Sequence, residues 1–340
     1  MTRACPACHA KCDDEPLRAF GHREAAQHFV LAEEFPERHA QLAEHIRQLW
    51  GGSRCELLAC KGCGLQFAWP FVAGGGEFYN LAYPHSDYPT QRWEFEQTVT
   101  ALQQLPFGPG KVIEIGSGCG HFLRQISPRL VASRDVIAIE YNDRARQQLQ
   151  ALGFNAHAHD VRSDVLTAYR GQVVALFMFQ VLEHMDDLDR LLQRVGELLR
   201  PGAQIFIAVP NIRRIDYNET QGALLDMPPN HISRWTRGAF EAMACRQGWE
   251  LLDLRTEPMS WRGFIKRDLV YSHMRRAQRS GSLANRVRAH RRTPLRLAAE
   301  GALASLAAPS RALRWALAAS RGVALGESVW VHLRAGAAAP

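Results

Sequence analysis

The chain has 340 residues, of which 46% are hydrophobic and 22% charged, a composition that excludes an intrinsically disordered protein. It contains no run of 18 uncharged apolar residues and no apolar core of a signal peptide at its start, so we expect a cytoplasmic protein without a membrane-spanning helix. The formal charge of +7 is uneven. Residues 261–322 contain 14 Lys or Arg and two acids, a net +12, which leaves −5 for the rest.

Six of the eight cysteines lie in the first 63 residues. Cys5 and Cys8 form one C-x-x-C pair, and Cys60 and Cys63 form a second, which Gly64 follows. Each pair places two thiolates on one tight turn, and two turns supply the four sulfurs of a structural Zn²⁺ site. Free thiols or a redox pair are the alternative. The neighbours that could replace a ligand are Cys12, Cys55, His9 and His22.

We expect residues 1–72 to form a zinc-binding module, with a helical hairpin over 24–50. Residues 73–110 are rich in aromatic side chains, among them Tyr79 and Tyr88, and show helical spacing over 92–105. This aromatic linker and lid helix either covers a ligand or packs between the module and the main domain.

From residue 111 onward, short apolar strands alternate with helices, which is the pattern of a parallel sheet. The expected strands are 111–115, 135–140, 155–159, 173–179, 204–209, 249–254 and 326–334. The expected helices are 120–126, 143–152 (capped by Asn142), 187–199 and 236–247. We therefore predict an α/β fold, a Rossmann-like seven-stranded sheet over 111–340, with a basic helical insertion at 261–322 before the last strand.

The first of these strands ends at three glycines spaced two apart, Gly116, Gly118 and Gly120, within the pattern E-x-G-x-G-x-G. A dinucleotide fingerprint would need its third glycine at position 121, which is His121. The motif resembles that of class I methyltransferases, which use S-adenosylmethionine. The resemblance implies that the turn lets the cofactor approach the backbone, offers N–H groups to its carboxylate, and that Glu114 holds its ammonium indirectly.

The resemblance also implies cofactor contacts at the ends of the next strands. Glu140 matches the acid that accepts the ribose hydroxyls, and Asp160 the acid that contacts adenine, although each could be a surface carboxylate. Gln180 would lie under the methionine part. The implied cofactor residues are Glu114, Gly116, Ser117, Gly118, Gly120, Glu140, Tyr141, Asp160, Val161 and Gln180.

Two histidines are candidates for removing a proton from the acceptor, because a neutral imidazole takes a proton near pH 7. His184 belongs to a Leu-Glu-His segment that resembles the one after strand four of the family. Some relatives bind a divalent metal there through E-x-x-E-H, but Gln180 replaces the first acid. His231 follows Pro228-Pro229 in a segment that resembles those of zinc-knuckle methyltransferases, some of which modify sugars. The alternative is that both histidines only order their loops. Asn211 and Tyr217 are expected to line the same cleft.

The basic insertion has three interpretations. Its helices could rest on an anionic membrane at the inner face and collect a lipid-linked substrate, or its arginines could hold the phosphates of a nucleotide sugar or of RNA. It could also be a solvated cap or a dimer contact. The lack of interleaved aromatic residues disfavours nucleic acid.

We therefore expect an S-adenosylmethionine-dependent methyltransferase with a structural Zn²⁺ and a small-molecule acceptor, such as a sugar, a lipid-linked compound or a secondary metabolite. The alternatives are an RNA or protein methyltransferase that docks through the zinc module and the insertion, and a non-catalytic scaffold. The glycines together with Glu140 and Asp160 argue against a scaffold. The methylated atom and the oligomeric state stay open.

Overall fold

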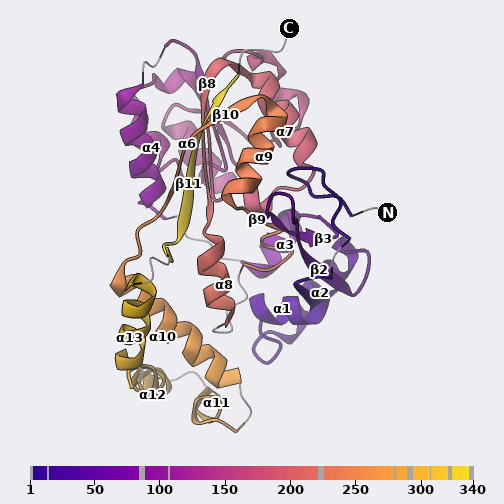
Figure 1. Ribbon diagram of the computed structural model, residues 1–340, viewed down its shortest axis with the longest axis vertical. Coiled ribbons are helices and arrows are strands. Elements are labelled where there is room, and N and C mark those ends of the chain that lie inside the picture. The colour runs from indigo at the N-terminus through magenta and orange to yellow at the C-terminus, as the bar shows by residue number, and fades with distance from the viewer. Residues whose placement is uncertain are drawn as a thin grey trace. The chain divides into compact units, whose positions relative to one another are not determined.

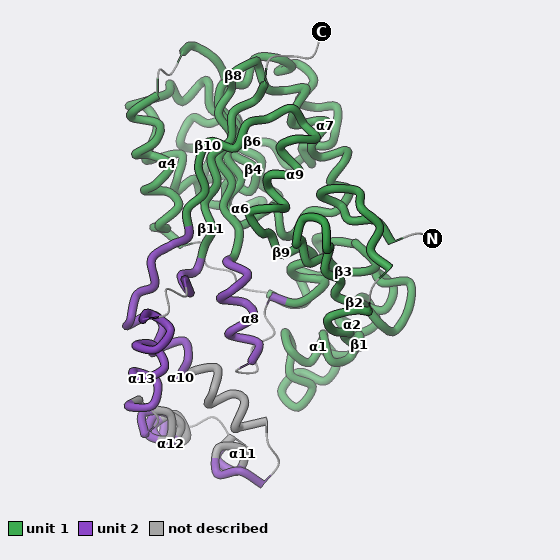
Figure 2. Tube along the Cα trace, in the orientation of Figure 1, with its two compact units in different colours: residues 1–210, 227–255, 328–340 green, residues 211–226, 256–327 purple. Residues whose placement is uncertain are grey.

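The computed structural model describes residues 3–13, 15–83, 89–105, 108–220, 226–278, 281–288, 294–306, 308–320 and 324–336. They fall into two compact units (Figure 2). The first contains residues 1–210, 227–255 and 328–340, and the second contains 211–226 and 256–327. The domain boundaries expected at residues 72 and 110 stay a prediction.

The first unit is built on a seven-stranded sheet in the order β10-β11-β8-β7-β4-β5-β6, which confirms the predicted fold class (Figure 1). Strands β4 to β8 pair in parallel, whereas β11 runs antiparallel to β8. The strands are β4 (Lys111–Ile115), β5 (Val136–Ile139), β6 (Asn155–His157), β7 (Val173–Phe179), β8 (Leu199–Pro210), β10 (Trp249–Thr256) and β11 (Ser328–Ala335).

Both faces of this sheet are covered, which explains why β5 and β7 are apolar at every position. Successive side chains alternate between two cores: Leu176 and Met178 belong to one, Phe177 and Phe179 to the other. The first core includes residues of α7 (Leu188–Leu198) and α9 (Arg237–Gln247). The second includes residues of α4 (Trp93–Gln104), α5 (Leu123–Ile126) and α6 (Asp143–Ala151).

Two helix starts show how local chemistry sets the boundaries. The Asn142 side chain accepts a hydrogen bond from the Ala145 N–H at 3.0 Å, which confirms the predicted cap of α6. The helix expected from residue 120 begins only at Leu123. Gly120 has φ +75°, a left-handed conformation that cannot start a right-handed helix.

A second, four-stranded sheet lies in the N-terminal part of the first unit, in the order β1-β2-β3-β9. It joins β1 (Arg18–Gly21), β2 (Arg54–Ala59) and β3 (Gln66–Trp69) to β9 (Ser233–Arg234), which lies far along the chain. The predicted hairpin is present as α1 (His22–Phe29) and α2 (Pro36–Leu49), and α3 (Gly75–Ala82) follows.

The second unit is helical. It contains α8 (Ile212–Thr220), α10 (Trp261–Gln278), α11 (Leu283–Arg288), α12 (Pro294–Ser305) and α13 (Ala308–Ser320). Tyr217 donates to the buried Asp268 at 2.9 Å, and the Asn211 amide donates to the carbonyls of Ala324 and Gly326. The two residues expected to line a cleft therefore hold this unit together. None of the described helices is long and apolar enough to cross a bilayer.

Candidate functional site

The carboxyl ends of β4 to β8 meet at one edge of the sheet because these strands are parallel. The chain proceeds from β4 outward to β5 and β6, then returns to β7 on the other side of β4. The strand order therefore reverses between β4 and β7, and such a reversal opens a crevice where open α/β sheets bind their ligands.

The glycine turn after β4 is shaped for close approach. Gly116 and Gly120 have φ of +74° and +75°, and a Cβ on Gly116 would lie 2.4 Å from Cγ2 of Val181. We expected the backbone N–H groups of this turn to be free for the cofactor carboxylate, and for part of the turn this expectation is wrong. The N–H groups of Gly116 and Ser117 donate to the Ile139 carbonyl, and that of Gly118 to Glu140. The glycines therefore give the turn its curvature and let Val181 pack against it, while these N–H groups of the turn have partners within the protein.

Glu140 follows β5 and braces this turn. Its carboxylate accepts the Gly118 N–H at 2.7 Å and the Asn142 N–H at 2.8 Å. Each carboxylate oxygen has a second lone pair, so two further donors such as ribose hydroxyls can be accepted. Glu140 thus links the β4 turn to the start of α6 and keeps acceptor capacity toward the crevice.

Glu114 lies on β4 and is a buried carboxyl, only 3% exposed. Its Oε2 has no hydrogen-bond partner among the described residues. Burial raises the pKa of Glu114 well above its ordinary value, and the nearby charge of Glu140 adds to this effect. A cation beside Glu114 would offset the free energy that burial of the ionised carboxylate costs, so the position suits an ammonium group.

Asp160 lies beyond β6 in an ion-pair network that the sequence did not indicate. It accepts Arg162 Nη2 at 2.6 Å, and Nη1 of the same guanidinium donates to Asp186 at 2.8 Å. Burial acts to raise the pKa of Asp160, but hydrogen bonds from Arg162 outweigh it and leave the pKa lowered. Val161 is buried and Tyr141 is 60% exposed. A cavity of about 620 Å³ adjoins Asp160 and is lined also by Phe71, Arg162, Ser163, Asp186, Asp187 and Arg190.

Gln180, directly after β7, has φ +58°, an uncommon value for a residue with a side chain. Its amide nitrogen donates to Oε1 of Glu94 and to the Ser328 hydroxyl, each at 3.1 Å. Glu94 is buried at the start of α4 and also pairs with Arg92 at 3.4 Å. Helix α4 therefore holds Gln180, the residue expected beneath the methionine part of the cofactor.

His184 and His231 are brought together by the fold, with ring centroids 4.6 Å apart. His184 Nδ1 lies 2.6 Å from the Asn230 carbonyl oxygen and 2.8 Å from the Tyr79 hydroxyl. A carbonyl only accepts, so Nδ1 carries the proton and Nε2 keeps the lone pair. Nε2 lies 3.8 Å from the buried carboxylate of Glu183. The ligand atoms of Glu183, His184 and His231 lie within 4.8 Å of one another and could also hold a divalent cation.

His231 owes its place to the small N-terminal sheet. The next residue, Ile232, donates to the Glu183 carbonyl at 2.9 Å and accepts from the Ala68 N–H at 2.8 Å. Two residues further, β9 pairs with β3 through Arg234 and Gln66. The loop with His231 is thus fixed between the sheet edge and the N-terminal part.

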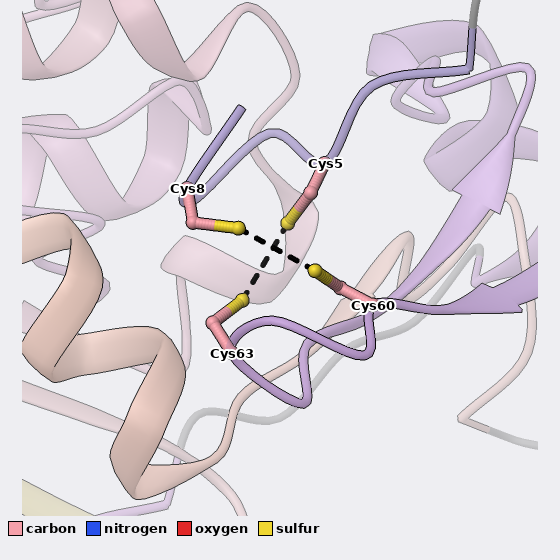
Figure 3. A group of neighbouring side chains, drawn as sticks. All are labelled: Cys5, Cys8, Cys60 and Cys63. Carbon is pink, nitrogen blue, oxygen red and sulfur yellow. Dashed lines mark hydrogen bonds between the residues drawn. The ribbon is translucent and has the colours of Figure 1, made fainter. Parts of the chain in front are cut away.

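The four cysteines of the two C-x-x-C pairs converge, with their side chains pointing toward one another (Figure 3). Cys5 Sγ lies 3.6 Å from Cys63 Sγ, and Cys8 Sγ lies 3.4 Å from Cys60 Sγ. Tetrahedral zinc with Zn–S bonds of about 2.3 Å holds its sulfurs about 3.8 Å apart, whereas a disulfide needs about 2.05 Å. The spacing and the all-thiol donor set therefore fit zinc.

The two cysteine turns share one geometry. In each, the residue after the second cysteine has positive φ, +62° at His9 and +77° at Gly64, and its N–H donates to the carbonyl of the first cysteine. Glycine adopts the positive φ at position 64 without the steric cost that a side chain would bring. The four alternative ligands have other partners: Cys12 Sγ donates to the Ala10 carbonyl, Cys55 Sγ to Glu56, His9 pairs with Asp189, and His22 lies 3.1 Å from the Ser53 carbonyl.

Both turns contact α9, a helix that packs against the main sheet, or its N-cap residue. The Thr236 hydroxyl donates to the Cys63 carbonyl at 2.8 Å, and the Arg246 guanidinium donates to the carbonyls of Pro6 and Ala7. Hydrogen bonds therefore join the cysteine cluster to the part of the protein that contains the main sheet.

Residues 91–254 match the protein family described as methyltransferase domain. The match covers just under half of the chain, and it indicates an enzyme domain that transfers methyl groups within residues 91–254. No curated protein matches the sequence.

Solved structures similar to this chain include three methyltransferases. An S-adenosylmethionine-dependent methyltransferase from Mesorhizobium loti is 13% identical, with 72% of this chain and 100% of that one covered and a TM-score of 0.44. One from Archaeoglobus fulgidus is 14% identical, with 71% and 94% covered and a TM-score of 0.41. A geranyl diphosphate C-methyltransferase from Streptomyces coelicolor A3(2) is 12% identical, with 71% and 79% covered and a TM-score of 0.39. These values are low, so the assignment rests on the family match.

The fit of the methyltransferase domain to its cofactor rests on one observation made above, the buried Glu114 oxygen that has no hydrogen-bond partner among the described residues. Sequence reasoning missed Glu94 and Arg162 and gave Glu183 no role. Charged residues at such positions are normally exposed, so no local pattern in the sequence indicates their burial.

Proposed function

We propose that this methyltransferase transfers the methyl group of S-adenosylmethionine to an oxygen or nitrogen of a small-molecule acceptor, a sugar, lipid-linked compound or secondary metabolite. The observation that carries the proposal is the pairing of His184 and His231 beside the glycine turn. Val181, three residues before His184, packs against Gly116 of that turn. The segment that carries His184 is therefore in contact with the glycine turn, which supports a role for His184 next to the cofactor.

The cofactor supplies a methyl group already activated by its sulfonium. Glu140 and Gln180 would hold and orient the cofactor, and Glu114 would neutralise its ammonium group. His184 Nε2 or His231 takes the proton that the acceptor loses, and the buried Glu183 stabilises the resulting imidazolium. Tyr79 and the Asn230 carbonyl keep the His184 ring in this orientation. The four cysteines would hold a structural Zn²⁺, which would stabilise the anchor of the His231 loop.

The histidine pair is tested with His231→Ala. We expect affinity for S-adenosylmethionine within about twofold of wild type and turnover lower by about a hundredfold or more, because general-base catalysis is lost while the cofactor turn is untouched. Binding is measured by calorimetry, and turnover by tritium transfer from labelled cofactor into the small molecules of a cell extract. His22→Ala is the matched control and should retain activity. Unchanged turnover in His231→Ala would remove this residue from the mechanism, and label found only in RNA or protein would overturn the acceptor class.

Glu114→Gln tests the buried carboxyl. Because the pKa of Glu114 is raised in the folded protein, the contribution of this residue to stability is fully present below the pKa of an unfolded Glu. That contribution is lost as the pH rises through the raised pKa. At pH 8 and without cofactor, we expect the free energy of unfolding of the variant to exceed that of wild type by about 1–2 kcal/mol, which raises the unfolding temperature by a few degrees. At pH 5 we expect little difference. Cofactor affinity should fall at least about tenfold. Thermal unfolding and calorimetry measure the two effects, and identical unfolding curves at both pH values would contradict this assignment.

A further inference from the structure

Helix α13 of the second unit exposes apolar side chains to solvent and buries a charged one. Its exposed face consists of uncharged residues, including Ala312, Leu313, Ala316, Leu317 and Ala319. Leu313 and Leu317, one turn apart, are 62% and 46% exposed. The buried face instead carries Arg311, which is 3% exposed and pairs with Asp268 at 2.8 Å. A helix of a soluble domain normally turns its leucines inward and its arginines outward.

Helix α12 repeats this feature. Its described exposed residues are uncharged and recur at helical spacing, among them Leu295, Ala298 and Ala302. Leu295 is 81% exposed, as is Leu306 directly after the helix. Six of the twelve large hydrophobic side chains that are exposed in the described chain, Trp261 and five leucines, lie between residues 261 and 317, so exposed apolar side chains are concentrated in this segment.

The charge of the same segment indicates what covers this surface. Residues 261–322 carry a net +12, and one of their two acids, Asp268, is buried. Arg262 and Arg286 are exposed, and the Arg314 side chain is 39% exposed. A second copy of the chain would bring two such basic segments together against their repulsion, and a nucleic acid would neutralise the arginines but leave the leucines in water. An anionic bilayer accepts both, because leucines enter the acyl boundary and arginines pair with lipid phosphates.

We propose that the exposed face of α12 and α13 docks on the surface of an anionic phospholipid bilayer. The docking does not depend on the proposed methyl transfer, since no residue of the crevice takes part. It gives the basic insertion a function that the methyltransferase domain alone does not require.

The full chain is tested by co-sedimentation with vesicles of phosphatidylcholine alone and of phosphatidylcholine with phosphatidylglycerol. We expect binding only to the anionic vesicles, with part of it retained at high salt because leucines are inserted. The double variant Leu313→Ser/Leu317→Ser should bind at least about tenfold more weakly. Leu17→Ser/Leu252→Ser is the matched control, since these leucines are exposed outside the insertion and should leave binding unchanged.

Failure of the wild-type chain to bind anionic vesicles would overturn the proposal. So would a dimer, seen by light scattering, that the Leu313→Ser/Leu317→Ser substitutions dissolve without any vesicle binding, because a second copy would then be the occupant. RNA binding that falls steeply with salt and occurs without vesicle binding would likewise assign the surface to nucleic acid. Equal vesicle binding by the leucine variant and its control would show that the leucines are not inserted.

Discussion

Removal of zinc is expected to have the largest effect on this protein. Structural zinc in small domains contributes on the order of 10 kcal/mol, and the sulfur atoms of Cys5, Cys8, Cys60 and Cys63 all lie within 4.8 Å of one another. The purified chain should contain about one equivalent of zinc, and Cys60→Ser or a strong chelator should lower the unfolding temperature by more than about ten degrees. Metal analysis and thermal unfolding measure both.

The loss should reach the active site through the anchor of His231. Ala68 on β3 holds Ile232, and β3 follows directly from the second cysteine turn. We therefore expect chelated protein at low temperature to lose turnover more than cofactor affinity, because the glycine turn lies on the main sheet. Cys245→Ser replaces an exposed cysteine outside the cluster and is the control that should keep its zinc. Less than about half an equivalent of zinc in the folded chain would contradict the site.

Glu140→Ala is expected to have the second-largest effect, a loss of cofactor affinity of at least about a hundredfold. The substitution removes the proposed acceptor of two ribose hydroxyls, and hydrogen bonds to a charged group contribute about 1.5–3 kcal/mol each. It also leaves the N–H groups of Gly118 and Asn142 without their partner, so the turn should loosen. Calorimetry measures the affinity, and hydrogen exchange of the Gly118 amide measures the turn.

Two further variants separate these contributions. Glu140→Gln keeps a carbonyl that can accept one N–H, so it should restore part of the protection of the turn while affinity stays low. Glu96→Gln removes a carboxylate from the helix α4 and should bind the cofactor like wild type. Cofactor affinity within threefold of wild type in Glu140→Ala would exclude a ribose-binding role for Glu140.

The sequence by itself determined the features that depend on neighbours along the chain. Short apolar runs that alternate with helical segments predicted the strands of the main sheet, because a strand buried on both faces is apolar along most of its length. The φ value at Gly64 and the cap at Asn142 were predictable for the same reason, since a tight turn and a helix start are satisfied within a few residues. The roles proposed for Glu140, Asp160 and the histidines stay predictions.

Only the tertiary structure decided which distant side chains meet. His231 reaches His184 because β9 pairs with β3, a contact between residues more than 160 positions apart that no local pattern encodes. Arg162 pairs with Asp160 and Asp186, and Arg311 is buried against Asp268 while leucines face outward. Such contacts arise from long-range pairing and burial, and these also determine whether a charged side chain faces solvent or the protein interior.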